Sequence, residues 1–273
     1  MSSILLPSTR IGQPGIAVDV LKGGFSARCV GAFFPGITMT NYAKGPGLTE
    51  VGNPTNPKRI IGSGRAVEIH PVDGSLGYSY LSLPPEVIPD SQEDISIIWA
   101  GVPMALSNSY GSCFTRGADG YGNGWSISAK FISGTTLDFG VVTTVPSVVG
   151  YSASITDTFV SGSYEKIAWR KKGTTVTGFH HRSKKTAAVT CGSSLRTSTK
   201  GFLLGGNFQS HSYAECCLIF LGALDDKEIW SLLENPMSAL ASFKRNLYFD
   251  MGAAGGDAVA SGSLQGLTLT SPT

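Results

Sequence analysis

The hydrophobic and polar positions of this 273-residue chain alternate in short runs that are separated by turn residues. Such runs, spaced roughly ten residues apart, are typical of a β-sandwich or β-barrel. The strongest apolar run, at 94–102, predicts a central strand with Ile95, Ile97 and Trp99 on one face and Ile98 on the other. Further strands are expected at 29–34, 65–69, 78–83, 110–116, 125–132, 136–144, 152–159, 164–170, 174–181, 187–190, 201–205 and 213–221.

One amphipathic segment interrupts the strands near the end of the series. Asp225 is followed three residues later by Glu228, which is the spacing of a capping box at a helix N-terminus. Leu224 and Ile229 are placed for a hydrophobic contact across this cap, and Pro236 ends the helix. No helical pattern lies between the predicted strands, which excludes a parallel α/β sheet.

The remaining segments lack a regular pattern. Residues 1–28 predict an extended arm, and the Gly- and Pro-rich stretch 44–64 predicts a long loop. Residues 250–273 are nearly all Gly, Ala, Ser and Thr, so they predict a tail that cannot build a core of its own. The expected organisation is therefore an arm, one sandwich domain at 29–249 and a tail.

The composition supports the β assignment and argues against a nucleic-acid partner and against membrane insertion. Hydrophobic residues make up 41% of the chain and charged residues 15%, which is enough apolar material for a core. The formal net charge of +2 lacks the basic excess of a nucleic-acid-binding protein. No run of 18 apolar residues is present, so we expect neither a nucleic-acid partner nor membrane insertion.

The five cysteines are odd in number and show no Cys-x-x-Cys spacing. Cys216 and Cys217 are adjacent, so they would point to opposite faces of a strand. The chain also begins without the pattern of a secretory signal. We therefore expect buried free thiols and assembly in a reducing cytoplasm.

A segment near the end of the strand series resembles the last part of a concanavalin A-like (LamG-like) domain. It comprises Phe202-Leu-Leu-Gly-Gly, the strand at 213–221, the helical segment 223–236 and Leu240-Ala-Ser-Phe243. Upstream, three segments are similar to strands of that family: Ile95-Ser-Ile-Ile-Trp99, Gly124-Trp-Ser-Ile127 and Lys166-Ile-Ala-Trp169. Phe179-His-His-Arg stands where the family carries Tyr-x-Asn-Gly. The resemblance covers residues 25–249 and implies an all-β, two-sheet antiparallel jelly-roll sandwich with one short C-terminal helix.

The opening Met1-Ser-Ser-Ile-Leu-Leu-Pro-Ser and the tail resemble bacteriophage structural proteins that carry this jelly roll. The resemblance implies a virion decoration protein on the particle surface, homo-oligomeric and attached to other virion proteins through its termini. The alternative is a lectin-like module of a phage tail or fibre, which would bind a host surface glycan. Both alternatives place the protein in the virion.

The residues that catalysis would need are not grouped in the sequence. A glycoside hydrolase needs two carboxylates that face one sugar, but no Glu of this chain is followed two residues later by Asp. A Gly-x-Ser-x-Gly nucleophile motif is absent as well. We therefore expect no enzymatic activity and no cofactor.

Three kinds of binding site remain open. Asp119 and Asn123 in a glycine-rich loop offer oxygen ligands to Ca²⁺, although the loop also suits a plain hairpin turn. Tyr110, Tyr121 and Trp125 flank this loop and could stack on sugar rings, although Trp125 also suits a core position. Six basic residues on one predicted hairpin form either an anionic-surface contact, for lipopolysaccharide or a capsid subunit, or solvated turns. They are Arg170, Lys171, Lys172, Arg182, Lys184 and Lys185.

Overall fold

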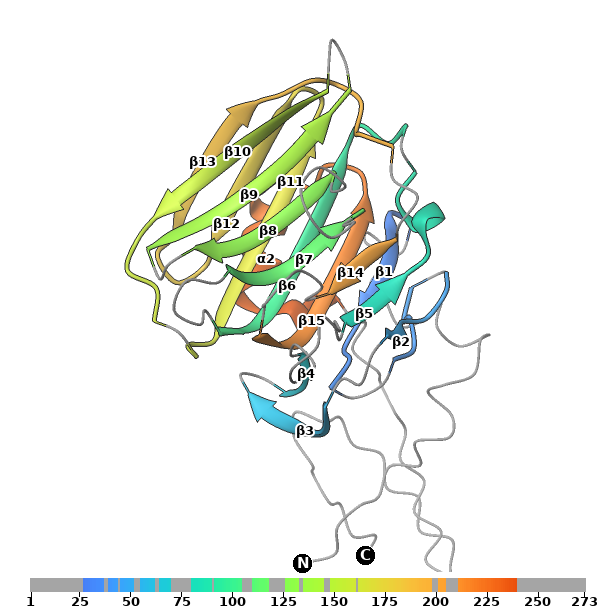
Figure 1. Cartoon of the computed structure of the whole chain (residues 1–273), viewed down its shortest axis with the longest axis vertical. Coiled ribbons are helices and arrows are strands. Elements are labelled where there is room, and N and C mark those ends of the chain that lie inside the picture. Colours follow the sequence, from blue (N-terminus) through green and yellow to red (C-terminus); the bar gives the residue numbers. More distant parts are fainter. Residues whose placement is uncertain are drawn as a thin grey trace, which may run out of the picture.

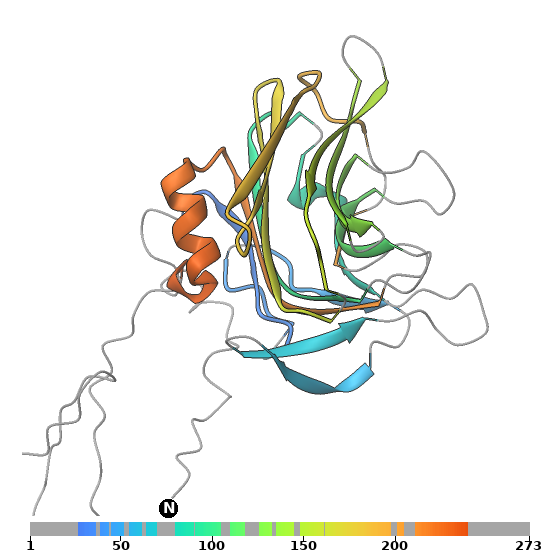
Figure 2. The same cartoon turned by 90° about the vertical axis from the view of Figure 1, so that its left-hand side faces the viewer.

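The computed structural model describes two antiparallel β-sheets that pack face to face, as Figures 1 and 2 show. It describes residues 27–36, 39–43, 45–51, 55–61, 64–69, 80–89, 91–104, 110–117, 126–132, 135–144, 148–160, 162–197, 201–204 and 211–239. The predicted two-sheet antiparallel sandwich is confirmed. The predicted arm and tail lie almost wholly outside the described residues.

The first sheet, here called sheet I, has β6 at its centre. In spatial order it contains β13 (Lys185–Thr190), β12 (Thr175–His180), β11 (Glu165–Lys172), β6 (Ile95–Met104), β15 (His211–Leu221), β4 (Gly64–Ile69) and β3 (Thr55–Ile61), and β1 (Cys29–Phe33) also pairs with β15.

The second sheet, here called sheet II, faces sheet I across the core (Figure 2). In spatial order it contains β10 (Val149–Thr156), β9 (Thr136–Thr143), β8 (Ile127–Ile132), β7 (Tyr110–Arg116), β14 (Phe202–Leu204), β5 (Tyr80–Leu83) and β2 (Thr49–Val51). Within the described ranges the helical elements are η3 (Pro85–Val87), α2 (Asp226–Glu234) and η4 (Pro236–Ala239).

The core between the sheets follows the alternation of β6. Ile95, Ile97 and Trp99 are fully buried in the main apolar cluster, whereas Ile98 is buried in a second cluster on the other face of sheet I. Both placements were predicted, because successive side chains of a strand point to opposite faces. Five large apolar residues of neighbouring strands are buried as well: Ile127, Ile167, Trp169, Leu218 and Phe220.

Helix α2 covers the outer face of sheet I (Figure 2). Its buried residues, Ile229, Leu232 and Leu233, share the second apolar cluster with Ile98 and Leu218 of the sheet. The fold therefore has three layers, in the order α2, sheet I and sheet II, and the helix does not cover sheet II.

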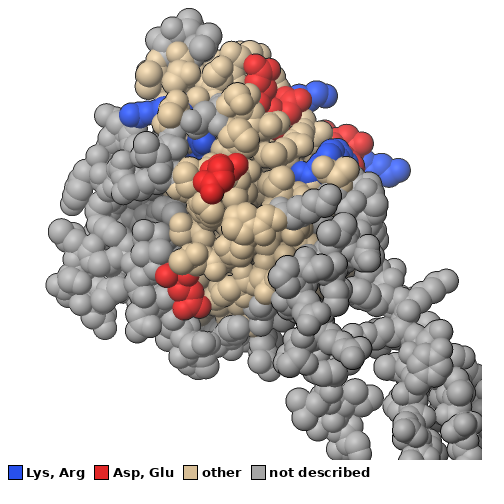
Figure 3. Space-filling view, turned by 90° about the vertical axis from the view of Figure 1, so that its right-hand side faces the viewer, with Lys and Arg blue, Asp and Glu red and all other residues tan. Residues whose placement is uncertain are grey.

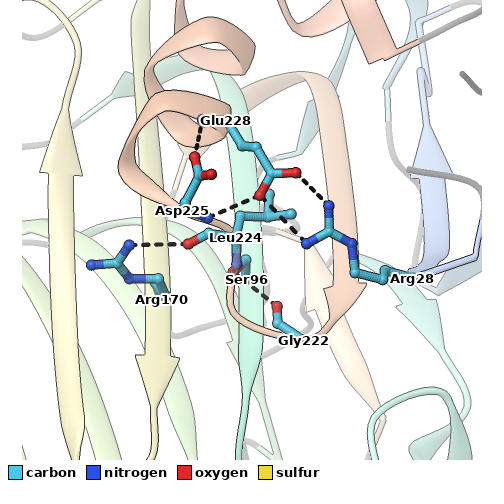
Figure 4. Close-up of polar contacts among 7 residues, drawn as sticks. All are labelled: Arg28, Ser96, Arg170, Gly222, Leu224, Asp225 and Glu228. Carbon is cyan, nitrogen blue, oxygen red and sulfur yellow. Dashed lines mark hydrogen bonds and ion pairs between the residues drawn. The ribbon is translucent and has the colours of Figure 1, made fainter. Parts of the chain in front are cut away.

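The predicted capping box at the start of α2 is present. The Glu228 amide donates to the Asp225 carboxylate at 2.7 Å, and the Asp225 amide donates to the Glu228 carboxylate at 2.9 Å. Arg28 forms an ion pair with Glu228, and Arg170 donates to the Leu224 carbonyl at 3.0 Å (Figure 4). The helix start is thus held by side chains from two distant parts of the chain.

The loop before the helix is tied directly to β6. The Ser96 hydroxyl donates to the Gly222 carbonyl at 3.1 Å and accepts from the Leu224 amide at 2.9 Å (Figure 4). Gly222 has φ of +140°, a backbone conformation that strongly favours glycine.

The stretch 44–64 was expected to be a loop, and this expectation is wrong. It contains β2 and β3, which pair with β5 and β4. Both lie at sheet edges and have neighbours on one side only, so tertiary pairing rather than local pattern forms them. β10 also begins earlier than expected, at Val149 rather than residue 152.

All five cysteines are buried free thiols, as predicted. Cys217 faces the core between the sheets, whereas Cys216 faces the cluster beneath α2. Burial raises the pKa of Cys29 to about 12 and the pKa values of Cys113, Cys216 and Cys217 well above their usual range. Among the described residues, no helix has the length and apolar character needed to cross a membrane.

Candidate functional site

A row of registered residues, five of which are serine or threonine, crosses the strands of sheet II and is here called the hydroxyl row. One member, Ser128 on β8, lies between Ile127 and Ala129, which both point into the core. Because strand residues alternate between faces, Ser128 and its registered neighbours point away from the core. Strand pairing places these residues side by side, in the order Thr49, Ser82, Leu203, Thr115, Ser128, Gly140 and Ser152.

Ser128 is the member of this row whose hydrogen bonding is incomplete. The residue is only 4% exposed, and within the described part of the chain its hydroxyl has no hydrogen-bond partner. A buried polar group without a partner costs about 1–3 kcal/mol, so native proteins rarely keep one without a reason. The Ser128 oxygen is shielded from solvent, so a ligand hydroxyl can supply the missing partner only after neighbouring side chains move aside.

The next outward position on β9 places a carboxylate beside the row. Asp138 accepts hydrogen bonds from the Ser154 hydroxyl at 2.9 Å and from the Ser152 hydroxyl at 3.2 Å. The Lys130 ammonium lies 4.0 Å from the same carboxylate. A carboxylate has about four lone-pair positions, so Asp138 keeps acceptor capacity beyond these contacts.

These groups match the chemistry of a hydroxylated ligand better than that of a metal ion. Serine and threonine hydroxyls both donate and accept, and the carboxylate accepts, so together they satisfy a ligand that carries several hydroxyls. Among the residues that the structure describes, no three His, Cys, Asp or Glu side chains gather where they could hold a metal ion.

The aromatic and calcium sites expected from the sequence are largely outside the described part of the chain. Tyr110 is the first residue of β7, where it pairs with Ile132. The other proposed residues, Asp119, Tyr121, Asn123 and Trp125, are not described. Sugar stacking and calcium binding at this loop therefore stay predictions.

The six basic residues of the predicted anionic-surface contact differ in their exposure and in their partners. Four of its cations already form ion pairs with carboxylates of the same chain: Arg170 with Asp226, Arg182 with Glu165, Lys184 with Glu234 and Lys185 with Asp157. Lys172 is exposed. Contact with an anionic surface at these five residues stays a prediction. Four of them would have to exchange a carboxylate of the same chain for a group of that surface.

Lys171 does not belong to that surface. Its side chain alternates with exposed Lys172 along β11 and is fully buried, so the expectation that it contacts an anionic surface is wrong. Elsewhere, on the side of the molecule where β2 and β5 lie, described acidic and basic side chains are scattered rather than grouped by sign (Figure 3).

A second polar cluster is fully internal. His180 Nε2 lies 2.8 Å from the Glu165 carboxylate, and its Nδ1 lies 2.7 Å from the Ser183 hydroxyl. The order serine, histidine, carboxylate is the one that activates nucleophiles in hydrolases. Here the His180 ring is fully buried and packs edge-on against Phe159, so a substrate cannot reach it. The cluster satisfies buried charges at the end of the core.

No motif in the sequence pointed to Ser128, Asp138, Ser152 or Ser154 as site residues. A signal was present, because Ser152 and Ser154 alternate with Ala153 and Ile155 and thus mark an outward polar face. Their grouping with Asp138 depends on the register between β9 and β10, which the sequence does not give.

Comparisons with protein-family models and with curated protein sequences give no match. Among solved structures, a botulinum neurotoxin type C structure is similar with TM-score 0.57 and 13% identity, covering 77% of this chain and 52% of that chain. The binding domain of Paraclostridial Mosquitocidal Protein 1 is similar with TM-score 0.56 and 10% identity, covering 76% and 52%. The botulinum neurotoxin serotype G binding domain is similar with TM-score 0.54 and 13% identity, covering 76% and 50%. The chain thus spans about half the length of these chains, and the likeness shows a shared β-sandwich fold.

Proposed function

We propose that this chain is a non-catalytic binding domain that recognises a glycan on the outer face of sheet II. The observation that carries the proposal is the polar group around Asp138, whose carboxylate accepts from the exposed Ser152 and Ser154. The buried Ser128 hydroxyl, which lacks a partner among the described residues, lies on the adjacent strand β8. Asp138 lies on the neighbouring strand β9, and the outer face of its sheet is not covered by helix α2. A sugar hydroxyl can accept from Ser128 while it donates to Asp138.

The structural neighbours support a binding role in general terms. Several are described as binding domains, among them one of a botulinum neurotoxin DC solved in complex with SialylT (TM-score 0.52). The cell entry of botulinum neurotoxin type C is described as dependent upon interaction with two ganglioside molecules. At 10–14% identity the likeness shows a shared fold and does not identify the residues that select a ligand in this chain.

The setting that we propose is the alternative drawn from the sequence, a phage tail or fibre that meets a host surface glycan. The opening residues and the tail support this setting through their resemblance to phage structural proteins. Attachment to a particle as a decoration protein, through both termini, stays a prediction. Cosedimentation of the full chain with assembled particles would test it.

The substitution Ser128→Ala tests glycan binding, because its effect on stability and its effect on affinity can be measured separately. In Ser128→Ala the unsatisfied hydroxyl is removed, so we expect a protein that is equally stable or about 1 kcal/mol more stable. Its affinity for the glycan identified on an array of immobilised glycans should nevertheless fall about fivefold to tenfold, the value of one lost hydrogen bond. Calorimetry with the purified glycan and thermal unfolding provide the two measurements.

Asp138→Asn should weaken binding further, because a charged acceptor forms stronger hydrogen bonds than a neutral amide. Thr175→Ala is the matched control, since Thr175 is an exposed hydroxyl residue on sheet I. Unchanged affinity in both Ser128→Ala and Asp138→Asn, or an array on which the full chain binds no glycan, would refute the proposal.

A further inference from the structure

Lys171 occupies a position where a strand in this fold normally carries an apolar side chain. The inward residues of β11 run Ile167, Trp169 and Lys171, and the first two belong to the main apolar cluster. Lys171 is fully buried, which is rare for lysine unless its charge is satisfied. Its four-carbon stem extends the core, and its ammonium lies at the end of it.

The ammonium donates to three backbone carbonyls. The Nζ atom lies 3.2 Å from the Glu93 carbonyl oxygen and 2.5 Å from that of Ser193, and it also bonds the Gly173 carbonyl. These oxygens come from the segment before β6, the β11–β12 turn and the segment after β13, so three distant parts of the chain meet at one atom. We call them the carbonyl nest.

The nest is held in place independently of the lysine. The Gly173 amide donates to the Asp94 carboxylate at 2.8 Å, which fixes the turn against the segment before β6. The Cys191 amide donates to the Thr174 carbonyl at 2.8 Å, which fixes the segment after β13 against the same turn. Both contacts bring the carbonyls together without involving Nζ.

The arrangement of acceptors selects a cation. An ammonium group has three N–H donors and no lone pair, so three carbonyl oxygens use all of its hydrogens. A neutral amine has only two N–H groups, and its lone pair would face the third carbonyl. Burial lowers the pKa of Lys171 from 10.5, and electrostatic interactions with Cys191 and with the carboxylates of Glu93 and Asp94 act in the opposite direction.

We propose that the carbonyl nest is a monovalent-cation site that the chain fills with its own lysine. Without the lysine side chain, the nest should bind a small ammonium ion from solution. A calcium ion is excluded as the matching occupant, because Ca²⁺ takes six to eight oxygen ligands and the nest offers three. The site lies at the end of the core, so this proposal does not depend on glycan binding.

Chemical rescue of Lys171→Ala tests the proposal in the full chain. The atoms that this substitution removes correspond to n-propylammonium. Adding n-propylammonium chloride should raise the unfolding temperature of Lys171→Ala saturably, by about 2 °C or more. Wild type and the exposed-neighbour variant Lys172→Ala should not respond, and neither should Lys171→Ala in tetramethylammonium chloride of equal ionic strength, because that ion has no N–H donor.

A response of the same size in wild type, or an equal response to tetramethylammonium, would overturn the proposal. If Lys171→Ala does not fold, the wild-type protein still decides the question through amine acetylation followed by mass spectrometry. With all three N–H groups bonded in the core, Lys171 should be acetylated about tenfold or more slowly than Lys172 in the folded chain. Equal rates would show that the ammonium is free and that the nest does not hold it.

Discussion

The two ends of the inward row of β11 bury opposite charges in different ways. Glu165 and Lys171 both point into the core and are both almost completely buried. Glu165 is satisfied by other side chains, since His180 lies 2.8 Å and Arg182 lies 2.7 Å from its carboxylate. Lys171 is satisfied by backbone carbonyls alone among its hydrogen-bond partners.

Glu165 and Lys171 thus show two ways in which this sandwich satisfies a charged group that is buried at the end of its core. Side-chain partners depend on residue identity, so a substitution of Glu165 or of His180 leaves the other buried polar side chain without that partner. Backbone carbonyls are supplied by every residue, so the nest depends on how the three segments meet and not on which residues they carry. Substitutions at the two ends should therefore differ in size and in their tolerance of replacement.

The largest effect is expected at the side-chain end. Glu165→Ala leaves His180 without its acceptor and Arg182 without its carboxylate, and we expect a loss of about 3–5 kcal/mol in the free energy of unfolding. Denaturant unfolding measures it. Glu234→Ala, which removes an exposed carboxylate, is the control and should cost little. A loss below about 1 kcal/mol for Glu165→Ala would mean that the buried pair contributes no more than a surface pair does.

A smaller loss is expected at the backbone end. Lys171→Met keeps most of the apolar stem but leaves the three carbonyls of the nest without their donor, and we expect a loss of about 2–3 kcal/mol. The loss stays below that of Glu165→Ala because no unpaired charge remains. Lys172→Met, measured by the same denaturant unfolding, should lie within about 0.5 kcal/mol of wild type. A variant Lys171→Met that matched wild type would show that an apolar chain end serves equally well.

At the N-terminus of α2 a charged side chain also satisfies a backbone group, but there the charge is negative and the side chain, Asp225, is exposed. The Asp225 carboxylate accepts from a backbone amide, so Asp225→Ala should cost about 1 kcal/mol. Lys227→Ala, at an exposed position in the first turn of the same helix, provides the control in thermal unfolding. If both variants unfold at the wild-type temperature, the capping box does not limit the stability of the sandwich.

The smallest effect is expected at the exposed counterpart of the Glu165 cluster, at the C-terminal end of α2. Hydrogen bonds from His181 and Lys184 lower the pKa of Glu234 below its usual 4.5. A carboxyl whose pKa is lowered by folding stabilises the protein above its unfolded pKa and loses that contribution as the pH falls through the folded pKa. The difference in unfolding temperature between wild type and Glu234→Gln should therefore be present near about pH 6 and vanish near about pH 3. A difference that stays constant over this range would contradict the assignment.

The sequence alone determined most of the elements and their faces. The alternation in 94–102 placed Ile95, Ile97 and Trp99 in the core and Ile98 on the opposite face, because successive side chains of a pleated strand point to opposite faces. The capping box and Pro236 located α2, because these signals act within one turn of chain.

Only the tertiary structure determined the edge strands of the two sheets, the hydroxyl row and the carbonyl nest. β2 and β3 form because β5 and β4 pair with them, and no pattern within 44–64 shows that. The hydroxyl row brings together residues of seven strands through register, and the carbonyl nest brings together oxygens that are present at every residue. Lys171 shows most clearly what the sequence could not determine. Two adjacent lysines predict a solvated surface, but in β11 the side chain of Lys171 points inward and donates to three carbonyls. Local patterns are set by neighbours in the chain, but burial, register and the meeting of distant backbone groups are set by the packing of the two sheets.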